Sequence, residues 1–173
     1  MENQASSKSV ILNYGLYLGT ISILIAVVKY AMGMQYEQEF YSGILGLIVL
    51  IVFIILGIKK FKTDNLNLLS FGQAVKIGIG ITFIATLIII AYYLIFGMLI
   101  EPDFQTLSIE AQKTVWADSF GMTPSEVEAT AERSKDFFYI SLFGGVLIIN
   151  LFLGGITSLI AGAVMKRTEE DQY

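Results

Sequence analysis

The stretch Ile77–Ile100, IGIGITFIATLIIIAYYLIFGMLI, decides the fold because it contains no charged residue and no alternating polar positions. An α-helix needs about 20 apolar residues to cross the ~30 Å hydrocarbon core of a bilayer. Strands of a membrane barrel would instead show alternating segments of roughly 10 residues. Three further runs of the sequence are also apolar and free of charged residues. The sequence therefore predicts an all-α, four-helix transmembrane bundle, with spans at about residues 10–28, 40–58, 77–100 and 137–165.

The composition fits a single membrane domain and excludes several classes of enzyme. Of the 173 residues, 55% are hydrophobic and only 15% are charged, whereas soluble domains carry roughly 25% charged residues. The chain has no histidine and no cysteine, which excludes imidazole bases, cysteine nucleophiles, disulfides and thiolate zinc sites. No other catalytic constellation is visible. We expect no enzyme activity, no cofactor, no metal and no nucleic-acid partner.

Lysine and arginine are distributed unequally over the two sides of the predicted membrane domain, and this bias sets the orientation of membrane proteins. One side holds Lys29, Lys113, Arg133 and Lys135 among ten acidic residues. The other side has the larger share, made up of Lys8, Lys59, Lys60, Lys62, Lys76, Lys166 and Arg167. Tyrosine and phenylalanine gather on the acidic side, as in an interfacial aromatic belt. We therefore expect both termini to lie in the cytoplasm.

The segment between the third and fourth spans, residues 101–136, is net acidic and has helical signals. Apolar residues recur at helical spacing over Thr106–Asp118, and Gly121 follows as a stop signal. Thr123-Pro124-Ser125-Glu126 combines a helix cap, a proline at the first helical position and a glutamate three residues after the cap. The pattern predicts an extracytoplasmic helical hairpin, whose second helix, Pro124–Asp136, continues into the fourth span.

Small and polar residues inside the spans are the candidates for helix packing, because lipid supplies no hydrophobic drive between helices. Asn150 falls near the middle of the fourth span. It either contacts a substrate or hydrogen-bonds another helix, and we favour the second interpretation. Gly43, Gly46 and Gly57 fit one line on the second span. The candidate packing residues are Gly15, Gly19, Asn150, Gly154, Ser158 and Gly162.

A lysine cluster lies on the predicted cytoplasmic side, between the second and third spans. Near an anionic bilayer each base contributes on the order of 1 kcal/mol of attraction. The cluster would therefore bind anionic headgroups or an acidic partner. Alternatively, these residues only fix the topology. The candidate contact residues are Lys59, Lys60, Lys62 and Lys76.

Three short motifs carry a resemblance to a known family. They are the segment Phe71-Gly72-Gln73-Ala74 before the third span, Asn13-Tyr14-Gly15 in the first, and Thr123-Pro124-Ser125-Glu126-Val127-Glu128 in the hairpin. From Ser7 to about Arg167 the chain resembles a bacterial family of small four-span proteins catalogued as a domain of unknown function. The resemblance implies a bacterial inner-membrane protein and brings no catalytic residues. It also suggests a link to polyprenyl-phosphate glycosyltransferases.

The sequence leaves a choice between classes of function. We expect a non-enzymatic accessory or scaffold subunit of a membrane complex, with a link to polyprenyl-phosphate glycosyl transfer. Its partners would be membrane lipids and either a protein or a second copy bound through the transmembrane helices. The alternative is a transporter of small molecules or lipids. Two features argue against transport: the spans contain no central charge and no proline. Transporters usually bind their substrate at charged or unwound segments in the middle of the membrane.

Overall fold

The computed structural model describes residues 6–37 and 40–168, and within these ranges the secondary structure is helical apart from one isolated β-bridge. Four of the helices are long and apolar enough to cross a membrane. The predicted all-α, four-helix transmembrane bundle, with a helical hairpin between the third and fourth spans, is thus confirmed. The elements are α1 (Ser7–Ala31), α2 (Phe40–Asp64), α3 (Phe71–Ile95), the π-helix η1 (Phe96–Ile100), α4 (Phe104–Phe120) and α5 (Pro124–Met165).

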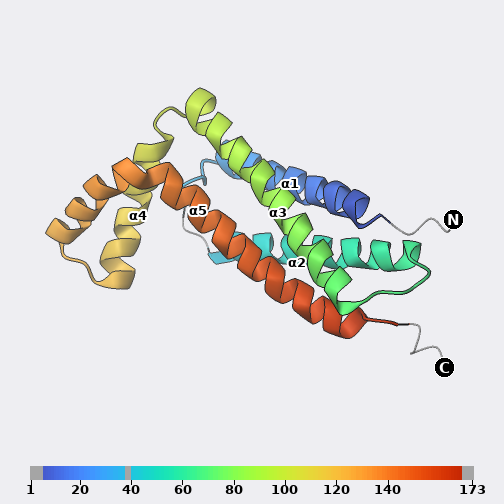
Figure 1. The fold of residues 1–173 in the computed structure, drawn as a ribbon. Helices are drawn as coiled ribbons and strands as arrows, with labels where there is room; N and C mark the ends of the chain where they lie inside the picture. The colour runs from blue at the N-terminus through green and yellow to red at the C-terminus, as the bar shows by residue number, and fades with distance from the viewer. Residues whose placement is uncertain (1–5, 38–39, 169–173) are drawn as a thin grey trace.

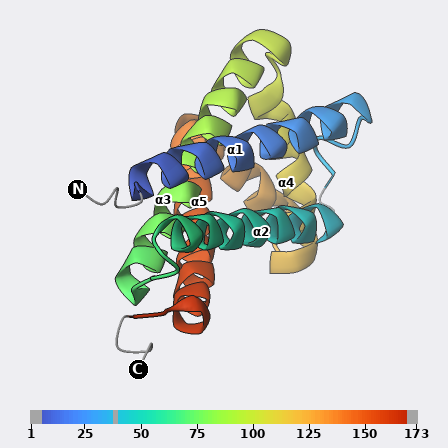
Figure 2. The same ribbon diagram turned by 90° about the vertical axis from the view of Figure 1, so that its right-hand side faces the viewer.

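The helices form two layers that cross steeply, α1 with α2 in one and α3 with α5 in the other (Figures 1 and 2). Helix α3 is central because it contacts α1, α2 and α5. The start of α1, the α2–α3 loop and the end of α5 lie at one end of the bundle, called here the termini end. The α4–α5 hairpin lies at the opposite end, called the hairpin end.

The helices extend beyond the uncharged runs because polar residues cap them. At the start of α3 the Ser70 hydroxyl accepts a hydrogen bond from the Gln73 amide (3.2 Å), and the Gln73 side chain accepts one from the Ser70 amide (2.8 Å). This reciprocal capping box satisfies two amides that the first helical turn leaves unpaired. The Phe71-Gly72-Gln73-Ala74 motif is therefore the first turn of α3, six residues before the predicted span.

Glycines allow the central helices to approach closely. A Cβ atom built on Gly15 would lie 2.7 Å from the Ile84 Cβ atom, and one on Gly19 would lie 2.9 Å from the Ile88 side chain. A Cβ on Gly154 would overlap Thr82, and one on Gly78 would overlap Ser158. These approaches join α1 to α3 and α3 to α5, which leaves the backbones in contact where lipid cannot enter.

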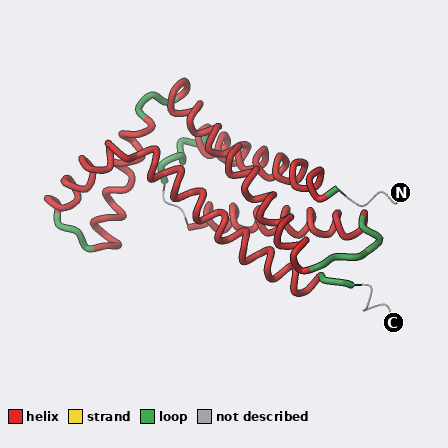
Figure 3. Tube along the Cα trace, viewed as in Figure 1, coloured by secondary structure: helices red, strands yellow, loops and turns green. Residues whose placement is uncertain are grey.

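The hairpin end, where Figure 3 shows two short helical arms, has a hydrophobic core of its own. Helix α4 ends at Gly121, whose φ of +65° is the left-handed conformation that glycine adopts readily. The Thr123–Glu126 capping box then starts α5, which runs without a break into the fourth span as predicted. Between the arms, and against η1, lie the buried side chains of Phe96, Phe104, Ile109, Ala131 and Phe138.

Candidate functional site

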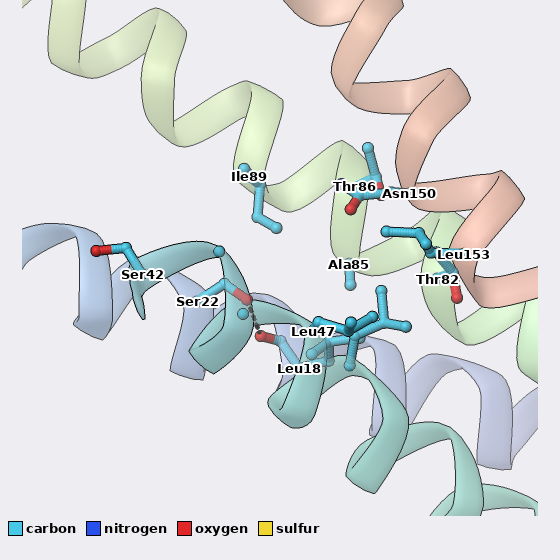
Figure 4. Close-up of a pocket in the computed structure, with 13 residues that line it drawn as sticks. Leu18, Ser22, Ser42, Leu47, Thr82, Ala85, Thr86, Ile89, Asn150 and Leu153 are labelled. Carbon is cyan, nitrogen blue, oxygen red and sulfur yellow. Dashed lines mark hydrogen bonds between the residues drawn. The ribbon is translucent and has the colours of Figure 1, made fainter. Parts of the chain in front are cut away.

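A cavity of about 240 Å³ lies inside the bundle, at the middle of the spans and toward the hairpin end. All four membrane helices contribute to it, as Figure 4 shows with α1 and α2 below and α3 and α5 above. Among the described residues, no charged side chain lines this mid-membrane cavity. Its lining residues are Leu18, Ser22, Ser42, Gly43, Gly46, Leu47, Leu50, Thr82, Ala85, Thr86, Ile89, Asn150 and Leu153.

Hydroxyl groups and one amide make the cavity polar at its centre. The Ser22 hydroxyl donates to the Leu18 carbonyl and the Thr82 hydroxyl to the Gly78 carbonyl, each over 2.9 Å. Each of these hydrogen bonds joins two residues of the same helix, in α1 for Ser22 and in α3 for Thr82. The side-chain amide of Asn150 makes no hydrogen bond to any residue of the described chain. A half-buried amide without a partner is costly in hydrocarbon, so this group sets the chemistry of the cavity.

The α2 wall of the cavity is open. A Cβ atom added to Gly43 or Gly46 would have no other heavy atom within 4 Å. From Gly43 to Ile48 the helix is exposed, and it becomes buried only at Leu50. By contrast, Gly57 lies tightly against Ile81 and Tyr14. The line of glycines predicted on the second span therefore packs at one end only, and the other end lines a space that is accessible from the side.

A second cavity, of about 210 Å³, lies nearer the hairpin end and shares Ile89 with the first. Gln35, Tyr36 and Ser108 contribute its polar groups. The Tyr36 hydroxyl is buried and has no hydrogen-bond partner among the residues that the structure describes. Burial, with a smaller contribution from the Glu101 carboxylate, raises the pKa of Tyr36 to about 12. This phenol therefore remains a neutral donor at every physiological pH.

The lysines of the predicted contact cluster differ in what they contact. Lys60 forms an ion pair with Asp64 (2.8 Å). The Lys62 ammonium donates to the Met165 carbonyl (2.8 Å), where it satisfies an unpaired group at the end of α5. Lys59 and Lys76 are exposed and have no ion pair with a described residue. A backbone bridge between Leu69 and Arg167 (2.9 Å in each direction) fixes the α2–α3 loop beside them.

The structure separates the predicted packing residues into two groups. Five lie at helix contacts: Gly15 and Gly19 between α1 and α3, and Gly154, Ser158 and Gly162 between α5 and α3. Ser158 is fully buried, and its hydroxyl donates to the Gly154 carbonyl. Asn150 instead lines the mid-membrane cavity. Among residues 6–37 and 40–168, acidic side chains form no group of three that could hold a metal ion.

The sequence reasoning missed the roles of Gly43, Gly46 and Tyr36. Glycines that pack and glycines that leave a space open look identical in a sequence. One signal was available: Ser22, Thr82, Thr86 and Asn150 all fall near the middle of their spans, and polar residues at a common depth indicate a shared polar space. Tyr36 lies in the short α1–α2 connection, where no pattern marks a buried side chain.

Comparison with known proteins gives one match. Neither the curated proteins nor the solved structures contain a significant match to this chain. A family model described as "Protein of unknown function (DUF4199)" matches residues 13–167. That range includes the cavity, the hairpin, the capping motif of α3 and the contact lysines, in agreement with the resemblance drawn from the sequence. The chain therefore belongs to this family of proteins of unknown function.

Proposed function

We propose that the protein is a non-enzymatic accessory or scaffold subunit of a membrane complex, which binds an acidic partner protein at its termini end. The observation that carries the proposal is the pair of exposed lysines, Lys59 and Lys76, which form no ion pair with a described residue and lie on a rigid surface. The Lys62–Met165 hydrogen bond and the Leu69–Arg167 bridge hold α2, α3 and α5 together there. A fixed surface loses little conformational entropy on binding.

The orientation proposed here follows from the excess of lysine and arginine at this end, which faces the cytoplasm in membrane proteins. In a bacterial inner membrane both termini would then be cytoplasmic. Exposed ion pairs contribute about 0.2–1 kcal/mol each. Lys59 and Lys76 together would therefore strengthen binding of an acidic partner by about 2- to 30-fold. The partner class suggested by the family resemblance is a polyprenyl-phosphate glycosyltransferase.

The test is purification of the intact protein from native membranes in mild detergent, with mass spectrometry of the proteins that co-elute. We expect a stoichiometric partner that is lost from the Lys59→Gln/Lys76→Gln variant. Lys60→Gln is the matched control, because that lysine is already paired with Asp64 and its loss should leave the partner bound. Isolation of a folded protein without any stoichiometric partner would contradict the proposal, as would a partner that tolerates the double substitution.

Transport of small molecules or lipids is the second candidate function, and the mid-membrane cavity favours it. All four membrane helices line the cavity, and transporters place their substrate near the middle of the bilayer. A flux assay in proteoliposomes distinguishes the two functions. Saturable, protein-dependent flux that is insensitive to Lys59→Gln/Lys76→Gln would favour transport, and the absence of flux for the molecules that the cavity binds would favour the accessory role.

A further inference from the structure

We propose that the mid-membrane cavity binds the uncharged, oxygen-bearing head of a membrane lipid, with the Asn150 side-chain amide as the group that recognises it. This inference is independent of the partner surface at the termini end, because none of the contact lysines lines the cavity. It assigns a ligand to a site that the accessory role does not require.

The first argument is that the space is maintained by the sequence. Some glycines of the bundle bring helices into contact, as Gly15 does against Ile84, whereas others, such as Gly155, have open space beside them and line no part of this cavity. At Gly43 and Gly46 they leave the α2 wall open, with nothing within 4 Å of an added Cβ atom. An empty cavity gives up the dispersion contacts that its lining atoms would otherwise make. A ligand restores these contacts.

The second argument concerns hydrogen bonding. Asn150 lacks a partner in the described chain, whereas Ser22 and Thr82 bond to carbonyls in their own helices. An asparagine amide offers two donors and one acceptor site with two lone pairs. A hydroxyl or carbonyl oxygen at the ligand head would pair with this amide and remove its cost in the membrane.

The third argument excludes charged heads. The described lining of the cavity has no lysine, arginine, aspartate or glutamate, so a phosphate or carboxylate there would lose its hydration without gaining a counter-charge from these residues. Its volume of about 240 Å³ is below the roughly 300–1,000 Å³ of sites that enclose a whole drug-sized ligand. The cavity therefore takes a head group, and the apolar chain stays in the bilayer beside the exposed part of α2.

Two kinds of membrane molecule supply this chemistry, lipid alcohols and isoprenoid quinones. We would add farnesol, decylubiquinone, farnesyl phosphate or squalane to the intact protein in mild detergent and measure bound lipid by native mass spectrometry. We expect one molecule of farnesol or decylubiquinone to bind saturably, with the tighter of the two identifying the source. Farnesyl phosphate, which adds a charge to farnesol, and squalane, which has no oxygen, should bind at least tenfold more weakly.

Two substitutions on opposite walls test the site itself. Asn150→Leu removes the amide at similar size, and Gly46→Leu adds bulk to the α2 wall; each should weaken binding at least tenfold. Gly155→Leu is the matched control, because its added side chain also has open space but does not line the cavity. Far-UV circular dichroism verifies that each variant is folded.

The proposal is overturned if folded wild-type protein binds neither farnesol nor decylubiquinone. It is equally overturned if squalane or farnesyl phosphate binds as tightly, or if either Asn150→Leu or Gly46→Leu binds like the control. Substitution of Lys59 and Lys76 should leave lipid binding unchanged, and the cavity variants should retain the partner protein. Failure of the lipid site and failure of the accessory function are therefore distinguishable.

Discussion

Two adjacent glycines in α5, Gly154 and Gly155, should respond oppositely to the same substitution. A Cβ atom on Gly154 would lie 2.9 Å from both the Cβ and Cγ2 atoms of Thr82 on α3, whereas favourable carbon–carbon contacts lie at about 3.5–4.0 Å. A Cβ on Gly155 would have nothing within 4 Å. Alanine at 154 therefore forces α3 and α5 apart, and alanine at 155 does not.

The expected difference in the free energy of unfolding between the two variants follows from two opposing effects of the added methyl group. Replacing glycine by alanine inside a helix stabilises it by about 1 kcal/mol, and both variants gain this. Overpacking a close contact costs about 1–3 kcal/mol, and only Gly154→Ala incurs it. The free energy of unfolding of Gly155→Ala should therefore exceed that of Gly154→Ala by about 1–3 kcal/mol, with Gly155→Ala equal to or above the wild type.

The assay is reversible unfolding of the protein in mild detergent by titration with a denaturing detergent, followed by far-UV circular dichroism. A double substitution identifies the contact responsible: Thr82→Ala removes the Oγ1 and Cγ2 atoms, so Gly154→Ala should cost less in that background than alone. Equal stability of Gly154→Ala and Gly155→Ala would refute the inferred α3–α5 contact, and so would additive effects of Gly154→Ala and Thr82→Ala.

Three further predictions concern the hairpin end and the topology. Tyr36→Phe removes a buried hydroxyl that has no hydrogen-bond partner in the described part of the chain, and it should raise the free energy of unfolding by about 1 kcal/mol. Folding raises the pKa of Tyr36 from 10.0 to about 12, so between these values the folded state binds more protons than the unfolded state. The free energy of unfolding of the wild type should therefore fall as the pH rises from 10 to 12. An equally steep fall in Tyr36→Phe would contradict this. Thr123→Ala with Glu126→Ala removes the α5 capping box, which should cost about 1 kcal/mol and speed amide exchange in the first turn; unchanged exchange would argue against the cap. Reporter fusions at Lys62 and Thr123 should give signals on opposite sides of the membrane, and signals on the same side would exclude four spans.

Most of the fold could be predicted because the bilayer restricts the solutions. Hydrocarbon allows only structures that satisfy every backbone group internally, so four apolar runs predict four helices. The Thr123–Glu126 cap also predicted that the hairpin helix joins the fourth span, and α5 has this form. The uncharged run predicts the third span from residue 77, and the helix that contains it begins six residues earlier, at Phe71, because polar residues such as Gln73 and Lys76 are compatible with a first helical turn.

The candidate site was harder to predict, because a cavity depends on how helices pack and not on local sequence. Asn150 was identified as an unusual residue, but its neighbours across the bundle depend on the angle at which α2 crosses α5. The different contacts of the lysines also depend on how the helices pack and not on the local sequence. Lys62 reaches the Met165 carbonyl across more than a hundred residues of sequence, while Lys59, three residues earlier, remains exposed.

The length of α5 has a mechanical consequence. Its 42 residues form one continuous helix, with a path of about 63 Å at 1.5 Å per residue, and Figure 1 shows that it changes direction between the hairpin and the bundle. Gly154, Ser158 and Gly162 hold its C-terminal part against α3, whereas its N-terminal part packs against α4. The hairpin is therefore joined to the membrane core by helical backbone hydrogen bonds and not by a loop, so a load on the hairpin would reach the α3–α5 contact through the helix itself.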